Sequence, residues 1–175
     1  MLIYLIGMPA SGKSTFGKII AQQLNYNFLD LDSFIEEKNN STIPQVFESK
    51  GEDFFRKLEQ QALQTTFKLK KTIVATGGGT PCFFDNLSNM KENGTVCFLN
   101  VEIDVLVERT FQTQQKQQDN RPLFKAANST KELHKLISQK WKERKDFYKQ
   151  AHFEIENSDS YEDKYDLFFS KLQRM

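Results

Sequence analysis

The sequence predicts an α/β protein whose parallel β-sheet is covered by helices on both faces. Short apolar runs alternate with segments of helical periodicity along the whole chain, which is the pattern of a parallel sheet with crossover helices. A glycine-rich loop separates the first run from the first helix. Polar and glycine-rich segments follow the second and third runs. Ligands bind where the carboxyl ends of such strands meet, so we expect the functional site at that edge.

The first half of the chain contains the clearest local signals. Residues 2–6 have the length and β-branched content of a buried strand, and residues 16–24 place apolar side chains on one helical face. Residues 26–30 predict a second strand, directly followed by a helix that begins at Leu31. Pro44 suits the first turn of the next helical segment, and Gly51 divides that segment into two helices.

The second half continues the alternation, and its main irregularity is a polar stretch at residues 112–120. This stretch is rich in glutamine and has no apolar periodicity, so we expect a mobile excursion from the domain and not a linker between domains. The remaining strands are expected over residues 72–75, 95–99 and 152–156, and the remaining helices over about 85–92, 102–111, 129–150 and 161–172.

Length and composition favour one intracellular domain spanning residues 1–175. The net charge of +1 gives no sign of a nucleic-acid or membrane partner. No apolar run is long enough to cross a bilayer, and no signal peptide is evident. Cys82 and Cys97 suit a reducing compartment, and His134 and His152 lack partners at metal-ligand spacing. We therefore expect a cytoplasmic protein.

The first loop matches the phosphate-binding pattern G-x-x-x-x-G-K-[S/T] at every fixed position. It reads Gly7-Met8-Pro9-Ala10-Ser11-Gly12-Lys13-Ser14-Thr15. The glycines allow backbone N–H groups to turn toward a phosphate, and the following helix adds its positive N-terminal end. Lys13 can reach the β- and γ-phosphates of a nucleotide, and the Ser14 hydroxyl can bind Mg²⁺. The alternative is a chance glycine-rich turn, which the strand before the loop and the helix after it disfavour.

Two carboxylates follow the second expected strand. Asp30 is the candidate for holding Mg²⁺ beside the phosphate loop, and the alternative is a helix N-cap. Asp32 could orient an attacking hydroxyl group or accept its proton. It could equally do no more than begin the next helix, where negative charge is favoured.

Glycines and arginines supply the other candidate binding groups. Gly77-Gly78-Gly79 leaves backbone amides open to a close-approaching substrate, unless it is only a flexible turn. Arg56 lies among aromatic residues, with Glu59 three positions on to hold its rotamer, and can clamp a carboxylate. Arg121 is placed like a lid arginine that closes on phosphate charge. Arg144 lies in a charged helical stretch that by itself is typical of a solvated surface.

Taken together, these motifs resemble the shikimate kinase family along the whole chain. The matching segments are the phosphate loop, Asp30-x-Asp32, Phe55-Arg56-x-x-Glu59, Gly77-Gly78-Gly79, Arg121-Pro122-Leu123 and Arg144-x-x-x-Tyr148-x-x-Ala151. The resemblance implies a three-layer α/β/α P-loop kinase fold with a five-stranded parallel sheet in the order 2-3-1-4-5. It also implies a shikimate-binding subdomain at residues 31–61 and a mobile lid at residues 111–125.

The same resemblance implies transfer of the γ-phosphate of ATP to the 3-hydroxyl of shikimate, in aromatic amino-acid biosynthesis. Lys13 and Arg121 would meet phosphate charge, and Ser14 and Asp30 would hold Mg²⁺. Asp32 would contact the shikimate hydroxyls. Arg56 and Arg144 would grip its carboxylate, Gly77, Gly78 and Gly79 would touch it, and Phe47 and Phe55 would flank its ring. Arg109 would lie against adenine. We expect a monomer.

Two features depart from the family pattern. The Gln-rich stretch lengthens the segment before Arg121, and residues 157–160 lack the proline with which many relatives stack on adenine.

Two other functions remain as alternatives. A related kinase of the gluconate kinase type would share the fold and the phosphate loop, but would not need the clamp arginines. A binding protein that had lost catalysis would show a change at Lys13, Asp30, Asp32 or Arg121, and all four are intact.

Overall fold

The computed structural model describes residues 1–115, 127, 129–156 and 161–174. Its strands are β1 (Leu2–Ile6), β2 (Asn27–Asp30), β3 (Thr72–Ala75), β4 (Thr95–Asn100) and β5 (Phe153–Glu156). Its helices are α1 (Lys13–Leu24), α2 (Leu31–Asn39), α3 (Ile43–Thr66), the short 3₁₀ helix η1 (Thr80–Cys82), α4 (Asn86–Asn93), α5 (Ile103–Gln115), α6 (Thr130–Tyr148) and α7 (Tyr161–Gln173).

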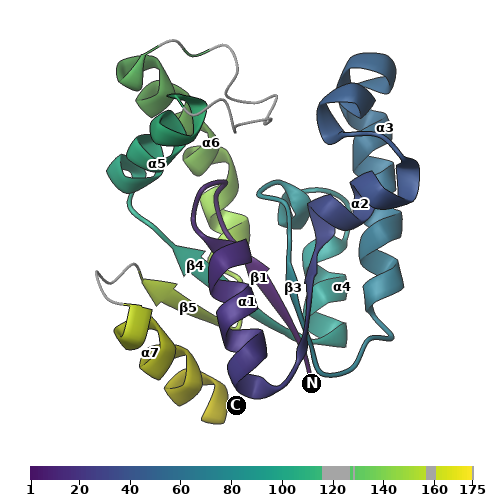
Figure 1. Ribbon diagram of the computed structural model, residues 1–175, viewed down its shortest axis with the longest axis vertical. Helices are drawn as coiled ribbons and strands as arrows, with labels where there is room; N and C mark the ends of the chain where they lie inside the picture. The colour runs from purple at the N-terminus through teal and green to yellow at the C-terminus, as the bar shows by residue number, and fades with distance from the viewer. Residues whose placement is uncertain (116–126, 128, 157–160, 175) are drawn as a thin grey trace.

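The described strands form one five-stranded sheet in the order β2-β3-β1-β4-β5, and all neighbouring strands are parallel (Figure 1). Leu5 in the central strand β1 is in register with Ala75 of β3 and with Cys97 of β4. This confirms the predicted sheet and its strand order. The loops that follow β1, β2 and β3 therefore leave the sheet at the same edge, where the sequence placed the polar signals.

Alternate residues of β1 point to two separate hydrophobic cores, one on each face of the sheet. Ile3 and Leu5 pack with apolar residues of α1 and α7, including Phe16 and Phe168. Tyr4 and Ile6 pack on the opposite face with apolar residues of α3, α4, α5 and α6. Because a strand presents successive side chains to opposite faces, β1 is buried on both sides. The result is the predicted three-layer α/β/α architecture (Figure 1).

The helices agree with the predicted pattern apart from three differences. Gly51 has φ 78° and ψ 176°, so α3 is two helical stretches that meet there, as predicted. The helix α1 begins at Lys13, directly on the phosphate loop and earlier than predicted. The turn η1 was not predicted. The helix α5 continues to Gln115, so the expectation of an irregular segment is wrong for residues 112–115. Residues 116–120 lie outside the described residues.

No helix in the described part of the chain combines the length and the apolar character needed to cross a membrane.

Candidate active site

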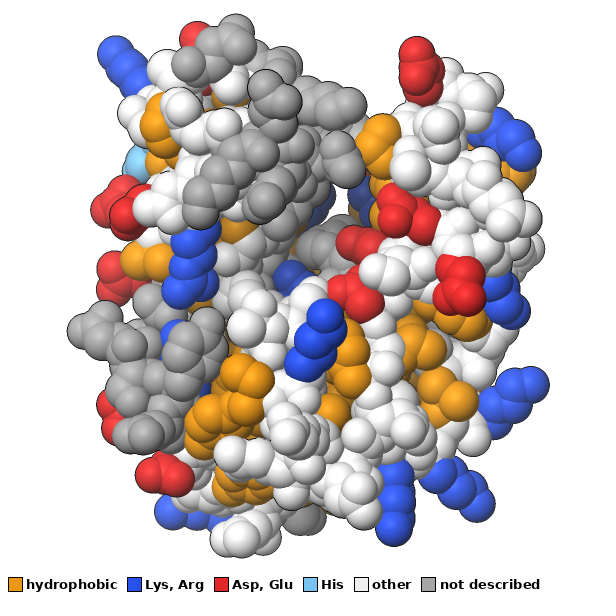
Figure 2. All heavy atoms as spheres, in the orientation of Figure 1, with side chains coloured by type: hydrophobic (Ala, Val, Ile, Leu, Met, Phe, Trp, Pro, Cys, Tyr) orange, Lys and Arg blue, Asp and Glu red, His pale blue; other side chains and the backbone are white. Residues whose placement is uncertain are grey.

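A cavity of about 800 Å³ opens at the carboxyl edge of the sheet. It lies between the α5 and α6 side of the molecule and the α2 and α3 side, and Figure 2 shows the hollow with charged side chains around it. The cavity is lined by both glycine-rich loops and by residues of α2, α3, α5 and α6. The predicted residues that line it are Pro9, Ala10, Gly12, Lys13, Ser14, Thr15, Asp30, Asp32, Phe55, Arg56, Gly77, Gly78, Gly79, Arg109 and Arg144.

The phosphate loop joins β1 directly to the N-terminus of α1. Gly12 is the N-cap residue and has φ 90°, a conformation that glycine adopts without strain. The ammonium group of Lys13 folds back under the loop and donates to the carbonyl oxygens of Gly7 and Met8, both at 2.9 Å, and contacts the Ser11 hydroxyl at 3.3 Å. The loop therefore presents a cation and the positive end of a helix to the cavity.

The side-chain oxygens of Ser14 and Asp30 lie together beside this loop. The Ser14 hydroxyl donates to Asp30 Oδ2 at 2.5 Å. The other oxygen, Asp30 Oδ1, accepts from the backbone N–H groups of Asp32 and Ser33 at 3.1 and 3.3 Å, so Asp30 is also the N-cap of α2. The alternative role as a helix N-cap is therefore present, and it leaves Asp30 Oδ2 directed at Ser14. A hydroxyl and a carboxylate are ligands that suit a hard cation such as Mg²⁺.

Asp32 is a half-buried carboxylate on the cavity wall. Burial raises the pKa of Asp32 to about 7, with the charges of Glu59 and Asp30 acting in the same direction and that of Lys13 opposing them. A carboxylate with a pKa near the working pH can exchange a proton during a reaction. Asp32 thus lies in the first turn of α2 and also lines the cavity, so its position is compatible with both roles considered from the sequence.

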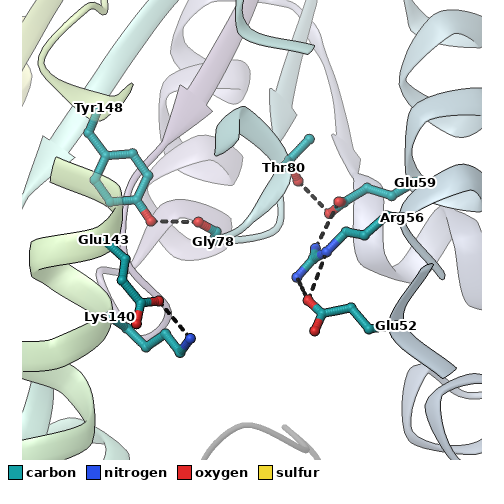
Figure 3. Close-up of polar contacts among 8 residues, drawn as sticks. All are labelled: Glu52, Arg56, Glu59, Gly78, Thr80, Lys140, Glu143 and Tyr148. Atoms are coloured by element: carbon teal, nitrogen blue, oxygen red, sulfur yellow. Dashed lines mark hydrogen bonds and ion pairs between the residues drawn. The ribbon is translucent and has the colours of Figure 1, made fainter. Parts of the chain in front are cut away.

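Arg56 is held by two carboxylates of its own helix, on either side along α3 (Figure 3). Its Nη1 donates to Glu59 Oε2 at 2.9 Å, and its Nη2 and Nε donate to Glu52 Oε1 at 2.8 and 3.1 Å. The guanidinium also lies over the ring of Phe83, 4.0 Å from its centroid. The predicted contact with Glu59 is present, and each terminal nitrogen keeps one N–H outside these three bonds.

Arg144 approaches the cavity from α6 and is only 7% exposed. This overturns the alternative of a solvated surface position. Gly79 lies close to the other arginine, since a Cβ atom built on it would be 2.8 Å from Arg56 Nη1. The cavity is thus lined by the phosphate loop, by the Asp32 carboxylate and by two buried guanidinium groups, Arg56 from α3 and Arg144 from α6.

Four predicted residues lie apart from this lining or outside the described chain. Gly7 contributes its carbonyl oxygen to Lys13. Ser11 lines a smaller neighbouring hollow beside β4. Arg109, which does line the main cavity, extends into this hollow as well and donates to the Ala10 carbonyl oxygen at 3.4 Å. Phe47 packs against Phe55, with ring centroids 4.8 Å apart, and is not part of the lining. Arg121 lies outside the described residues.

Sequence reasoning assigned no role to three residues that organise this site. Glu52 could have been found from its spacing, since it is four positions before Arg56 on one helix. Thr80 donates its hydroxyl proton to Glu59 Oε1 at 2.6 Å, which links the second glycine loop to α3. Tyr148 donates its hydroxyl proton to the Gly78 carbonyl oxygen at 2.5 Å. No local sequence pattern predicts the last two contacts, because the two residues that form each of them are distant in the sequence.

Comparison with known proteins agrees with this geometry. The family model for shikimate kinase matches residues 9–173. The chain is 42% identical over 162 residues to a shikimate kinase of Phocaeicola vulgatus, covering 93% of this chain and 89% of that protein. It is 38% identical over 173 residues to a shikimate kinase of Bacteroides thetaiotaomicron, covering 99% of this chain and 95% of that protein.

Solved structures give the same answer. The crystal structure of shikimate kinase from Bacteroides thetaiotaomicron superimposes with a TM-score of 0.89 at 33% identity, covering 99% of this chain and 98% of that one. Shikimate kinase from Acinetobacter baumannii in complex with shikimate superimposes with a TM-score of 0.85 at 33% identity, covering 98% of this chain and 90% of that one. A gluconokinase from Sinorhizobium meliloti superimposes with a TM-score of 0.58 at 14% identity, which shows a similar fold and no more. The chain belongs to the shikimate kinase family.

Proposed function

We propose that this protein transfers the γ-phosphate of ATP to the 3-hydroxyl of shikimate, giving shikimate 3-phosphate and ADP. The observation that carries the proposal is a single cavity lined both by the phosphate loop and by two buried arginines, Arg56 and Arg144. The second half of such a cavity suits a small acceptor with a carboxylate, because guanidinium groups bind carboxylates through paired N–H donors. The shikimate kinase of Acinetobacter baumannii, solved in complex with shikimate, supports the same substrate.

Donor binding is assigned to the loop from Gly7 to Thr15. Its backbone N–H groups and Lys13 would meet the phosphates. Arg109 would lie against the adenine ring, and Arg121 would close on the transferring phosphate from the lid at residues 111–125.

Ser14 and Asp30 would hold Mg²⁺, and their oxygens lie 2.5 Å apart beside the phosphate loop. The bound cation would screen negative charge on the phosphates of ATP. In the protein itself, Asp30 Oδ1 is already fixed by two N–H groups of α2, so Oδ2 is the oxygen that can turn to the cation.

Acceptor binding and the chemical step are assigned to the opposite side. Arg56 and Arg144 would hold the substrate carboxylate, and the residues Gly77, Gly78, Gly79, Phe47 and Phe55 would surround the ring. Asp32 would orient the 3-hydroxyl. The hydroxyl oxygen forms a bond to the γ-phosphorus, the bond from that phosphorus to the β–γ bridging oxygen breaks, ADP leaves, and the hydroxyl proton passes to Asp32. Catalysis then rests on positioning and charge stabilisation.

We also infer a single working domain over residues 1–175, with residues 31–61 as the shikimate-binding subdomain. We further propose that it works as a monomer. A cytoplasmic location fits the use of ATP and the two free cysteines.

The test is an ADP-production assay with ATP, run with shikimate or gluconate and with or without Mg²⁺. Turnover that needs both shikimate and Mg²⁺ is expected. ADP release with gluconate alone would favour the other kinase, and ATP binding without any turnover would favour a binding protein.

The carboxylate clamp is tested separately with Arg144→Ala. This variant should raise the shikimate KM at least tenfold, because a buried guanidinium partner is lost. Lys142→Ala is the matched control, since Lys142 is an exposed cation on the same helix. Equal constants for Arg144→Ala and the wild type would show the clamp assignment to be wrong.

A further inference from the structure

The hydroxyl group of Tyr148 joins the two glycine-rich loops of the active site. Tyr148 is fully buried in the last turn of α6, and its ring stacks on Phe98 with centroids 5.2 Å apart. Its hydroxyl donates to the Gly78 carbonyl oxygen at 2.5 Å and lies 3.6 Å from the sulfur of Met8 (Figure 3 shows the first contact). One atom therefore contacts the second glycine loop and the phosphate loop at once.

Arg144 lies on the same helix as this hydroxyl. It lies one helical turn before Tyr148, so both side chains share a face of α6. Burial raises the pKa of Tyr148 well above its ordinary value, whereas the charge of Arg144 lowers it. The hydroxyl thus stays protonated and donates to Gly78, one helical turn from the guanidinium of the carboxylate clamp.

Gly78 is enclosed between the phosphate loop and this tyrosine. A Cβ atom built on Gly78 would lie 2.6 Å from the Pro9 ring, so the two loops are in direct contact there. On its other side the Gly78 carbonyl oxygen accepts from Tyr148. A loop of three glycines has large backbone freedom, and these two contacts restrain it where Gly77, Gly78 and Gly79 line the cavity.

We propose that Tyr148 is a positioning residue for the acceptor. Its hydroxyl fixes the Gly78 peptide relative to Arg144 and to the phosphate loop, and so sets the place of the acceptor carboxylate and ring in relation to the donor phosphate. The proposal rests on the proposed function and adds to it a residue that contacts neither the reacting atoms nor, in this assignment, the substrate. The ring packs in the hydrophobic core, and the hydroxyl group positions the Gly78 peptide.

The test compares Tyr148→Phe with Tyr4→Phe. Phenylalanine keeps the stacking on Phe98 and removes only the hydroxyl. Tyr4 is the matched control, because it is also fully buried and its hydroxyl makes one buried hydrogen bond, to Thr66 Oγ1 at 2.8 Å, away from the cavity. Both variants lose a similar buried bond, so a general loss of stability should lower the Tm of both.

The readouts are the Kd of shikimate by calorimetry without ATP, and the KM values of shikimate and of ATP. Tyr148→Phe should weaken shikimate binding and raise the shikimate KM about five- to tenfold, the usual effect of losing one hydrogen bond. The ATP KM should change less than twofold. Tyr4→Phe should leave all three constants unchanged.

The possible failures can be told apart. If the wild type binds no shikimate, both the proposed function and this inference fail. If the wild type binds shikimate and Tyr148→Phe binds it equally tightly, only the inference fails. Equal weakening by Tyr148→Phe and Tyr4→Phe would also overturn it, because the hydroxyl would then act only through stability.

Discussion

Replacing Asp32 with asparagine should abolish turnover and stabilise the folded protein above neutral pH. Burial raises the pKa of Asp32 to about 7, and the charges of Glu59 and Asp30 contribute to the rise. A carboxyl group whose pKa is higher in the folded state than in the unfolded chain destabilises the fold once the pH passes its pKa in the unfolded chain. Asparagine has a similar shape and no charge, so the variant avoids this cost.

The magnitude follows from the difference between the two pKa values. The carboxyl moves from 3.8 to about 7 on folding, and one pKa unit corresponds to about 1.36 kcal/mol, so ionised Asp32 costs on the order of 4 kcal/mol at most. Between these pKa values the folded state binds more protons than the unfolded state. The free energy of unfolding contributed by Asp32 therefore falls as the pH rises from about 4 to 7, and stays low above that.

Urea unfolding without ligands measures this directly. The advantage of Asp32→Asn over the wild type should grow by about 2–3 kcal/mol from pH 5 to pH 8. Glu143→Gln is a control for the sign of the stability change. The hydrogen bond from Lys140 lowers the pKa of Glu143, so removing the Glu143 charge should not stabilise the fold. An advantage of Asp32→Asn that is the same at both pH values would refute the reasoning.

The same ionisation should govern the rate of the wild type. With a pKa of about 7, Asp32 is mostly protonated at pH 5.5 and mostly ionised at pH 8, so kcat/KM for shikimate should rise on the order of tenfold or more between these pH values. A carboxyl group at 3.8 would already be ionised at pH 5.5, and a flat profile would exclude the assigned role.

Three further substitutions test other parts of the site. Lys13→Met should abolish ADP production while circular dichroism shows an intact fold, because the phosphate loop loses its cation. Gly78→Ala should lower kcat/KM at least tenfold, since a Cβ atom 2.6 Å from the Pro9 ring must separate the two loops; unchanged kinetics would mean that this contact does not matter. Glu52→Gln should lower the shikimate KM about two- to threefold at low salt, because two carboxylates on Arg56 over-neutralise the clamp and Glu52 is half-exposed. A higher KM would instead mean that Glu52 holds Arg56 in place.

The parts of the fold that sequence predicts well are those determined by neighbouring residues. The phosphate loop and the Gly51 break needed only local motifs, whereas the strand order came from the family resemblance. Asp30 and Ser14 also follow this rule, because each lies at the end of a strand or start of a helix at the same edge of the sheet. Parallel pairing then brings them to hydrogen-bonding distance.

The parts that could not be predicted depend on packing between distant segments. Arg144 lies in a stretch of charged residues, and it is buried only because α6 packs beside the second glycine loop, where residues 78 and 148 meet. Helical spacing places both Phe47 and Phe55 near the cavity, but it does not determine which ring lines the cavity. The helix α5 continues to Gln115 because glutamine is a good helix former and no Gly or Pro interrupts it.

Trp141 gives the protein a built-in optical probe. It is the sole tryptophan of the chain, its ring stacks on Phe98 at 6.0 Å, and it lies 6.2 Å from the ring of Tyr148, one turn before the clamp arginine of α6. Because tryptophan emission responds to its surroundings, events in the acceptor half should change the intrinsic fluorescence without any label. Screens for small molecules that bind there can then be run on the unmodified protein.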